Sequence, residues 1–382
     1  MFLEKEGKLI YSYDGETVCI EAWGKDALRV RATKNRSFTG RDWALEAKDA
    51  HAGEVEIFED PSAKGGAFAN MYEGTDTSYG KITNGKLHAV IDSGSVITFY
   101  HEDGRVLLKE HFRRLRDEES MPLNIMGREY SNGVGDNFRI VTRFVARKGE
   151  KIFGMGQYQQ HELDLKDCML ELAQRNSQVS VPFYLSSIGY GFLWNNPGVG
   201  QVMFANNGTE WVTESGKEID YLVIAGDTPA EIEENYMTLT GKPPMMPEYG
   251  MGFWQCKLRY WNQEQLLSVA RKYKELGVPL DVIVVDFFHW TKQGEFKFDP
   301  KYWPDVPGMC RELKEMGIQV VVSVWPTVDI YSENFEEMKE KGYLVRTEHG
   351  VPLTMLCGGN EVFFDATNPD ACLLYTSPSP RD

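Results

Sequence analysis

The hydrophobic pattern of this chain changes its period at one place, the proline-rich segment KPPMMPEYG that begins at residue 242. Before this segment, short stretches of alternating polar and apolar residues are separated by Gly, Asn and Asp, which is typical of antiparallel hairpins. After it, apolar runs alternate with amphipathic stretches, which is typical of parallel strands covered by helices. The change predicts two domains with a boundary near residues 242–248, and 382 residues are enough for two hydrophobic cores.

Residues 1–245 form the first predicted domain and carry the pattern of short antiparallel strands. The alternation and its turn signals are clear in KLHAVIDSGSVITFYHEDGRVLLKE and YGFLWNNPGVGQVMFANNGTEWV. So many strands over roughly 200 residues predict a β-sandwich. One helix is expected in TPAEIEENYMTLTG, because Thr228 can cap it, Pro229 suits its first turn and Gly241 can end it.

Residues 246–371 form the second predicted domain. Strands are expected within Gly252–Gln255, Leu280–Phe288 and Ile318–Trp325, and helices in NQEQLLSVARKYKELG, VPGMCRELKEMG and SENFEEMKEKG, each ending on glycine. The strands are apolar on both faces, as in a parallel sheet covered by helices. These units, followed by the apolar piece EVFFDATNP in an expected long loop, predict the first part of a (β/α)8 barrel. Its site would lie at the C-terminal ends of the strands.

Composition excludes several classes of partner. The formal net charge is −16, from 41 Lys+Arg against 57 Asp+Glu, and this disfavours nucleic acid and anionic membranes because both require clustered positive charge. No stretch approaches the ~20 apolar residues of a membrane span. Charges at positions 4, 5 and 6 argue against a secretory signal. We therefore expect a cytoplasmic protein with no nucleic-acid or membrane partner.

No cofactor or metal site is expected. The cysteines form no CxxC pair and have no histidine at zinc-ligand spacing, so they are expected to be reduced thiols. They are Cys19, Cys168, Cys256, Cys310, Cys357 and Cys372. His161, His289 and His349 also lack partners and are expected in loops or on the surface. No GxGxxG fingerprint joins a strand to a helix, so neither nucleotide nor flavin is expected.

Five motifs follow one another between Lys151 and Ala371. They are FGMGQYQQ with VPFYLSSIGYGFLWNN, PPMMPEYGMGFWQCKLRY, GVPLDVIVVDFFHW with FDPKYWPD, MGIQVVVSVWPTVD, and FFDATNPDA. Together, and in this order, they resemble glycoside hydrolase family 31. The resemblance implies a galactose-mutarotase-like N-terminal sandwich with a loop over the active site, followed by the first strands of the catalytic barrel. It implies a retaining, exo-acting α-glycosidase, and FWQCKLRY with DFFHW looks closer to the α-xylosidase branch than to the α-glucosidases.

The same resemblance assigns no catalytic residue in this chain. Retaining glycosidases use a nucleophilic carboxylate and a general acid; the family carries both as aspartates on its fourth and sixth barrel strands, and no aspartate here matches either motif. The chain is therefore expected to be truncated and inactive by itself. Residues 372–382, CLLYTSPSPRD, depart from the family and are expected to be a non-native tail, with a genuine short tail as the alternative. Self-association of a full-length protein stays open.

A first group of residues is expected to bind the sugar. Asp286 ends an otherwise apolar strand, where an unpaired carboxylate is costly unless it faces a polar site. The family motif implies that it accepts hydrogen bonds from distal hydroxyls of the terminal sugar, with a capping or salt-bridged role as the alternative. Trp325 is expected to form an apolar wall, or to lie in the core. If strand alternation continues, Phe287 or Phe288 faces the pocket and crowds a hydroxymethyl group, which favours xylosides.

A second group completes the expected pocket lining. It consists of Arg259, Tyr260, Trp290, Gln157 and Gln159. For Arg259, an ion pair at the barrel rim is an equal alternative. Asp365 is expected to support a loop or a helix start instead of touching sugar.

Other functions remain open at this stage. An α-glucosidase or α-transglucosylase of the same family would bind a similar oligosaccharide or α-glycoside. A noncatalytic carbohydrate-binding protein would explain the missing aspartates, but an incomplete barrel would leave unpaired strand edges, which a selected binding module should not retain.

Overall fold

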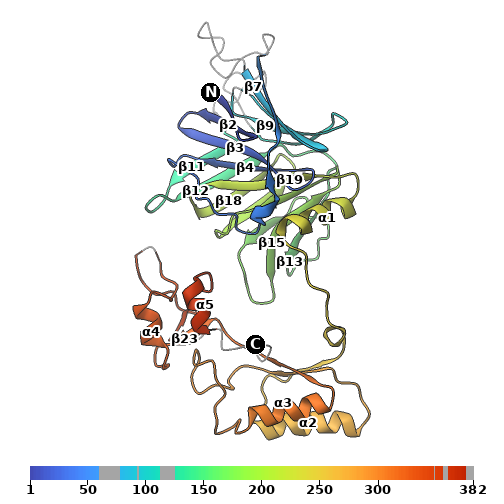
Figure 1. The fold of residues 1–382 in the computed structure, drawn as a ribbon, viewed down its shortest axis with the longest axis vertical. Coiled ribbons are helices and arrows are strands. Elements are labelled where there is room, and N and C mark those ends of the chain that lie inside the picture. Colours follow the sequence, from blue (N-terminus) through green and yellow to red (C-terminus); the bar gives the residue numbers. More distant parts are fainter. Residues whose placement is uncertain (60–77, 93, 112–124, 348, 356–359, 376–382) are drawn as a thin grey trace. The chain divides into compact units, whose positions relative to one another are not determined.

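A computed structural model describes the chain except for residues 60–77, 93, 112–124, 348, 356–359 and 376–382 (Figure 1). It divides into two compact units, Met1–Pro243 and Pro244–Asp382, which we call unit 1 and unit 2. The division falls within the segment where the hydrophobic period changes. Each unit has its own core and is described separately.

The largest sheet of unit 1 is antiparallel and contains strands from both ends of the unit. Its strands are β1 (Phe2–Lys5), β2 (Lys8–Tyr13), β3 (Glu16–Trp23), β4 (Ala27–Thr33), β5 (Ala50–His51), β13 (Ile152–Gln157), β15 (Val179–Ser186), β16 (Tyr190–Trp194) and β19 (Ile219–Ala225). Their order is β1-β2-β3-β4-β19-β16-β15-β13, with β5 on β3. Strand β4 pairs with β19, so this sheet joins segments from the beginning and the end of the unit.

Further antiparallel sheets complete the sandwich. One contains β6 (Glu54–Glu59), β7 (Ser78–Asn84), β8 (Leu87–Ile91), β9 (Ile97–His101) and β10 (Val106–Lys109), in the order β10-β9-β8-β7-β6. Another contains β11 (Arg128–Asn132), β12 (Phe138–Phe144), β14 (Met169–Leu172), β17 (Gly200–Ala205) and β18 (Gly208–Gly216), in the order β11-β12-β18-β17-β14. A 3₁₀ helix, η1 (Ala47–Asp49), precedes β5. The predicted β-sandwich is confirmed.

The expected turn and helix signals of unit 1 are confirmed. Asn84 pairs with Leu87 across a two-residue hairpin loop in which Gly85 has a φ of 54°. Helix α1 (Pro229–Thr240) begins after Thr228, whose side chain accepts a hydrogen bond from the Glu231 N–H, and ends at Gly241 with a φ of 95°. The helix packs against β16 and β19.

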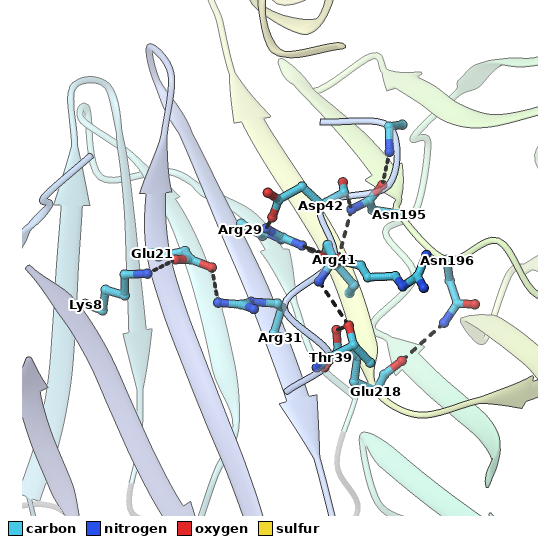
Figure 2. Close-up of polar contacts among 12 residues, drawn as sticks. Lys8, Glu21, Arg29, Arg31, Thr39, Arg41, Asp42, Asn195, Asn196 and Glu218 are labelled. Carbon is cyan, nitrogen blue, oxygen red and sulfur yellow. Dashed lines mark hydrogen bonds and ion pairs between the residues drawn. The ribbon is translucent and has the colours of Figure 1, made fainter. Parts of the chain in front are cut away.

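A buried polar network holds the segment after β4 against the large sheet (Figure 2). The Arg29 guanidinium donates to both carboxylate oxygens of Asp220, over 2.9 and 2.6 Å, and to Asp42 Oδ1 over 2.7 Å. Asn195 Nδ2 donates to Asp220 as well, over 2.9 Å. Figure 2 also shows Glu21 placed between two cations on neighbouring strands. The buried charges of Arg29, Asp220 and Glu21 each have an opposite partner, whereas the buried Glu218 carboxylate accepts hydrogen bonds from the Thr39 N–H and hydroxyl.

Unit 2 contains the start of the predicted barrel. Its parallel sheet runs β20 (Trp254–Gln255), β21 (Val282–Val285) and β22 (Gln319–Val322), in that order. Helices α2 (Gln263–Glu275) and α3 (Val306–Glu315) follow β20 and β21, and a 3₁₀ helix, η2 (Glu248–Met251), precedes the sheet. Each strand is shorter than the apolar run that predicted it. The glycines after the helices, at 277, 317 and 342, take left-handed φ values as expected.

The part of unit 2 after β22 departs from the expectation. Strand β23 (Thr327–Asp329) pairs with β24 (Glu361–Phe363) in antiparallel fashion, so EVFFDATNP contributes a strand where a long loop was expected. Helix α4 (Phe335–Glu340) is shorter than its motif, and α5 (Pro369–Tyr375) closes the described chain.

Asp365 has the expected supporting role at the start of α5. Its carboxylate accepts hydrogen bonds from the Thr367 N–H and hydroxyl, over 2.9 and 2.6 Å. Residues 372–375 of the expected tail lie in α5, whereas 376–382 lie outside the described residues. Within the described part of the chain, no helix is long and apolar enough to cross a membrane.

Candidate functional site

Asp286 directly follows β21 at the C-terminal end of the parallel sheet. Its Oδ1 accepts the Phe287 N–H over 2.8 Å, and its Oδ2 lies 3.9 Å from the Cys256 Sγ. Among the described residues it forms no ion pair, so the salt-bridged alternative is not found. A half-buried carboxylate without a cation keeps most of its capacity to accept hydrogen bonds.

Phe287 and Phe288 do not continue the alternation of β21, so alternation along the strand does not decide which of the two rings faces a pocket. The strand ends at Val285, and Phe288 takes a φ of 65°, in the left-handed region. The Phe287 and Phe288 rings therefore have different neighbours, although their centroids are only 4.4 Å apart. The Phe287 ring stacks on Trp325, with centroids 5.4 Å apart, whereas Phe288 is 51% exposed.

Aromatic rings from the ends of two neighbouring strands gather beside Asp286. Trp325 lies three residues beyond β22 and not within it, and it is half-buried. Its ring contacts Phe287 and also Trp290, at a centroid distance of 6.5 Å. We call Phe287, Trp290 and Trp325 the aromatic wall. It offers an apolar surface next to a hydrogen-bond acceptor, a combination typical of small-molecule sites.

Tyr260 and Arg259 are adjacent in sequence but have different surroundings. Tyr260 is 5% exposed and packs in the core of unit 2, which corrects its expected place in a pocket lining. Its hydroxyl accepts a long hydrogen bond of 3.4 Å from Gln255. The Arg259 guanidinium instead lies over the rings of Trp261 and Phe288, and the ion pair that was the equal alternative is not found among the described residues.

Gln157 and Gln159 belong to unit 1. Gln157 is the last residue of β13, and both side chains are exposed. Gln159 lines a surface hollow of about 210 Å³ together with Tyr158 and Met169. A larger cavity in unit 1, of about 330 Å³, is lined by Arg128 and by two glutamates that form ion pairs with it. These charges therefore neutralise one another within the sandwich.

The sequence did not single out Cys256 or Trp261 for the site, and it did not predict the burial of His289. Cys256 directly follows β20, so the rule that functional groups follow strand ends would have found it. His289 was expected in a loop or on the surface; it lies in the loop after β21, where it is 5% exposed and packs against Trp290 and Phe298. The exposed positions of His161 and His349 agree with their expected place.

No metal centre is found in the described part of the chain. No cluster of three or more His, Cys, Asp and Glu side chains could hold an ion there. Cys19, Cys168, Cys256 and Cys310 are free thiols, whereas Cys357 lies outside the described residues. At the ends of β21 and β22, Asp286 can accept hydrogen bonds and the aromatic wall can make apolar contacts.

Acidification should loosen the segment after β21. Burial lowers the pKa of His289 below its usual 6.5, although the Asp286 carbonyl and carboxylate oppose this shift. Because the folded-state pKa lies below the unfolded-state value, the neutral ring stabilises the fold above pH 6.5 and this contribution is lost at lower pH. We expect faster amide exchange in peptides covering β21 at about pH 5.5 than at about pH 7.5, after correction for the intrinsic rate. His289→Gln should remove the difference, and His349→Gln should keep it; equal behaviour of the two variants would contradict this assignment.

Both units match family models built from known proteins. The model of the glycosyl hydrolase 31 N-terminal galactose mutarotase-like domain matches residues 17–202, and that of the glycosyl hydrolases family 31 TIM-barrel domain matches residues 243–379. A protein of Pseudescherichia vulneris named uncharacterized family 31 glucosidase ORF2 is 42% identical over 97% of this chain and 68% of its own length. The α-xylosidase of Saccharolobus solfataricus is 36% identical over 54% of this chain and 30% of its own length.

A solved structure supports the same placement. The crystal structure of a GH31 α-xylosidase from a soil metagenome, complexed with xylose, is 46% identical and superimposes with a TM-score of 0.87. The match covers 97% of this chain and 54% of that one. The chain thus spans about half the length of this enzyme.

Proposed function

Because this chain belongs to glycoside hydrolase family 31, we propose that the whole protein is a retaining, exo-acting α-glycosidase that prefers α-xylosides. The observation that carries the proposal is the Asp286 carboxylate, free of any described cation, beside the aromatic wall at the strand ends. The similarity to proteins named α-xylosidase supports the choice of sugar.

Each part of the site has a role in this proposal. Asp286 accepts hydrogen bonds from the hydroxyls of the terminal sugar, which a carboxylate does more strongly than a neutral group. The aromatic wall covers the C–H side of the pyranose and excludes water. No aspartate of the sequence matches the family's nucleophile or general acid, so we propose that residues 1–382 bind the glycoside without hydrolysing it.

Binding of methyl α-xyloside to the chain tests the role of Asp286. We expect Asp286→Asn to weaken binding by about tenfold to a hundredfold, because charged hydrogen bonds are replaced by neutral ones. Ligand-observed NMR measures both affinities. Asp281→Asn is the matched control, since Asp281 precedes β21 at the opposite end and its carboxylate accepts only the Phe253 N–H among the described residues. Equal effects of both substitutions would remove Asp286 from the site.

α-Glucosides are the second candidate substrate class, favoured by the 42% identity to a protein named family 31 glucosidase. If the Phe287 ring occupies the space of a hydroxymethyl group, Phe287→Ala should shift the ratio of xyloside to glucoside affinity by about tenfold towards glucoside. Titration with the methyl α-glycosides measures this ratio. Phe288→Ala should change the ratio less, because Phe288 is 51% exposed and borders the aromatic wall, where it contacts Phe287 and Trp290. A parent chain that prefers the glucoside would favour the α-glucosidase alternative.

A further inference from the structure

We propose that Arg259 is a specificity-determining residue that binds a carboxylate on the leaving-group side of the glycoside. The inference rests on the proposed function and adds a substrate class, α-glycosides with an anionic aglycone. Arg259 lies in the segment between β20 and α2. Its guanidinium carbon is 3.6 Å from the centroid of the Trp261 ring and 5.1 Å from that of Phe288.

These two aromatic contacts hold the guanidinium without using its hydrogen-bond donors. A cation within about 6 Å of an aromatic face is attracted by the ring, whereas the guanidinium N–H groups point outward in their own plane. Among the described residues, Arg259 has no ion-pair partner and donates no hydrogen bond. The side chain is therefore held in place with its donors available.

The backbone at Phe288 provides a second, independent observation. A φ of 65° is rare for a bulky residue, and such conformations concentrate at ligand sites. Core packing does not account for it, because the ring is 51% exposed. In this conformation the Phe288 ring, only two residues after Asp286, contacts Arg259 as well as Phe287 and Trp290.

The two charged groups of this region require different ligand chemistry. Asp286 accepts hydrogen bonds, which suits the hydroxyls of a neutral sugar, whereas Arg259 only donates them. A cation without a described counter-ion favours an anion, and the planar fork of Arg matches the two oxygens of a carboxylate. The Phe287 and Phe288 rings, 4.4 Å apart, connect the two positions. In this proposal, the leaving group of a sugar bound at Asp286 lies beside Arg259.

Paired ligands test the inference on the full chain. We compare 4-carboxyphenyl α-xyloside with its neutral isostere, 4-carbamoylphenyl α-xyloside, by ligand-observed NMR titration. The parent chain should bind the carboxylate about tenfold more tightly, and added salt should reduce this ratio. Arg259→Gln should bring the ratio to about one, and Arg259→Lys should restore part of it because the charge remains but the fork is lost. Lys257→Gln removes an exposed cation two residues away and should keep the parent ratio.

The outcomes separate this inference from the proposed function. A parent chain that binds both glycosides equally would overturn the role of Arg259 and leave the sugar site standing. A preference that survives in Arg259→Gln would overturn it as well, and loss of preference in Lys257→Gln would replace it by general attraction to local positive charge. If neither glycoside binds, the proposed function fails and the inference fails with it.

Discussion

Asp220→Ala should destabilise unit 1 by about 3–5 kcal/mol, because it leaves a buried cation without its main partner. The side chains of Arg29 and Asp220 are 0% and 1% exposed, and two hydrogen bonds join them. The other carboxylate partner of Arg29, Asp42, is 33% exposed and bonds through a single oxygen. Water cannot reach the freed guanidinium unless the sheet opens where β4 meets β19. The penalty should therefore appear as lost folding free energy.

Guanidinium chloride unfolding of the full chain, followed by circular dichroism, measures this effect. The matched control is Asp136→Ala, which breaks the exposed pair with Lys217, 2.7 Å apart. Exposed pairs contribute little because water and salt screen them, so this midpoint should not change measurably. A small shift for Asp220→Ala, similar to that of the control, would show that the network relaxes or hydrates without cost.

Trp211→Ala should cost unit 1 about 3–5 kcal/mol through a different mechanism, the loss of a large side chain from a packed core. Trp211 is 0% exposed, and its ring centroid lies 5.1 Å from that of Phe192 and 5.5 Å from that of Trp194. These rings come from different sheets of the sandwich, so none can move into the cavity without shifting a strand. The cavity would persist, and the contacts across it would be lost.

The same unfolding assay tests whether the lost side-chain volume is what destabilises the Trp211→Ala variant. Trp211→Phe keeps most of the ring and removes an indole N–H that has no described hydrogen-bond partner, so its cost should be much smaller than that of the alanine variant. Met203→Ala on the neighbouring strand β17 is the surface control, because Met203 is 40% exposed. If the phenylalanine variant is as unstable as the alanine one, ring volume is not what Trp211 contributes.

Local features were the most predictable part of this protein. The cap of α1 at Thr228, the hairpin at Gly85 and the glycine ends of the unit 2 helices depend on residues within a few positions, and each is confirmed. The position of Asp286 at a strand end followed from an apolar run that stops at a charge. Its availability did not follow, because only the folded chain shows whether a cation approaches it.

The aromatic residues mark the limit of prediction from sequence. Alternation along β21 suggested that one of the two phenylalanines faces a pocket, but the strand ends earlier, at Val285, and Phe288 takes a left-handed φ. Tyr260 and Arg259 looked equivalent in sequence, yet one packs in the core and the other lies over two rings. Nothing in the local sequence distinguishes these outcomes.

The sequence by itself determined the two architectures, the place where they meet, the family and the carboxylate at the end of β21, because periodicity, caps and motifs are properties of neighbouring residues. Only the tertiary structure decided that Arg29 pairs with Asp220, 191 positions away, that Phe287 meets Trp325, and that His289 is buried. These contacts join distant segments. They depend on which strands pair and how side chains share the space between them, and that is settled by packing across the whole unit.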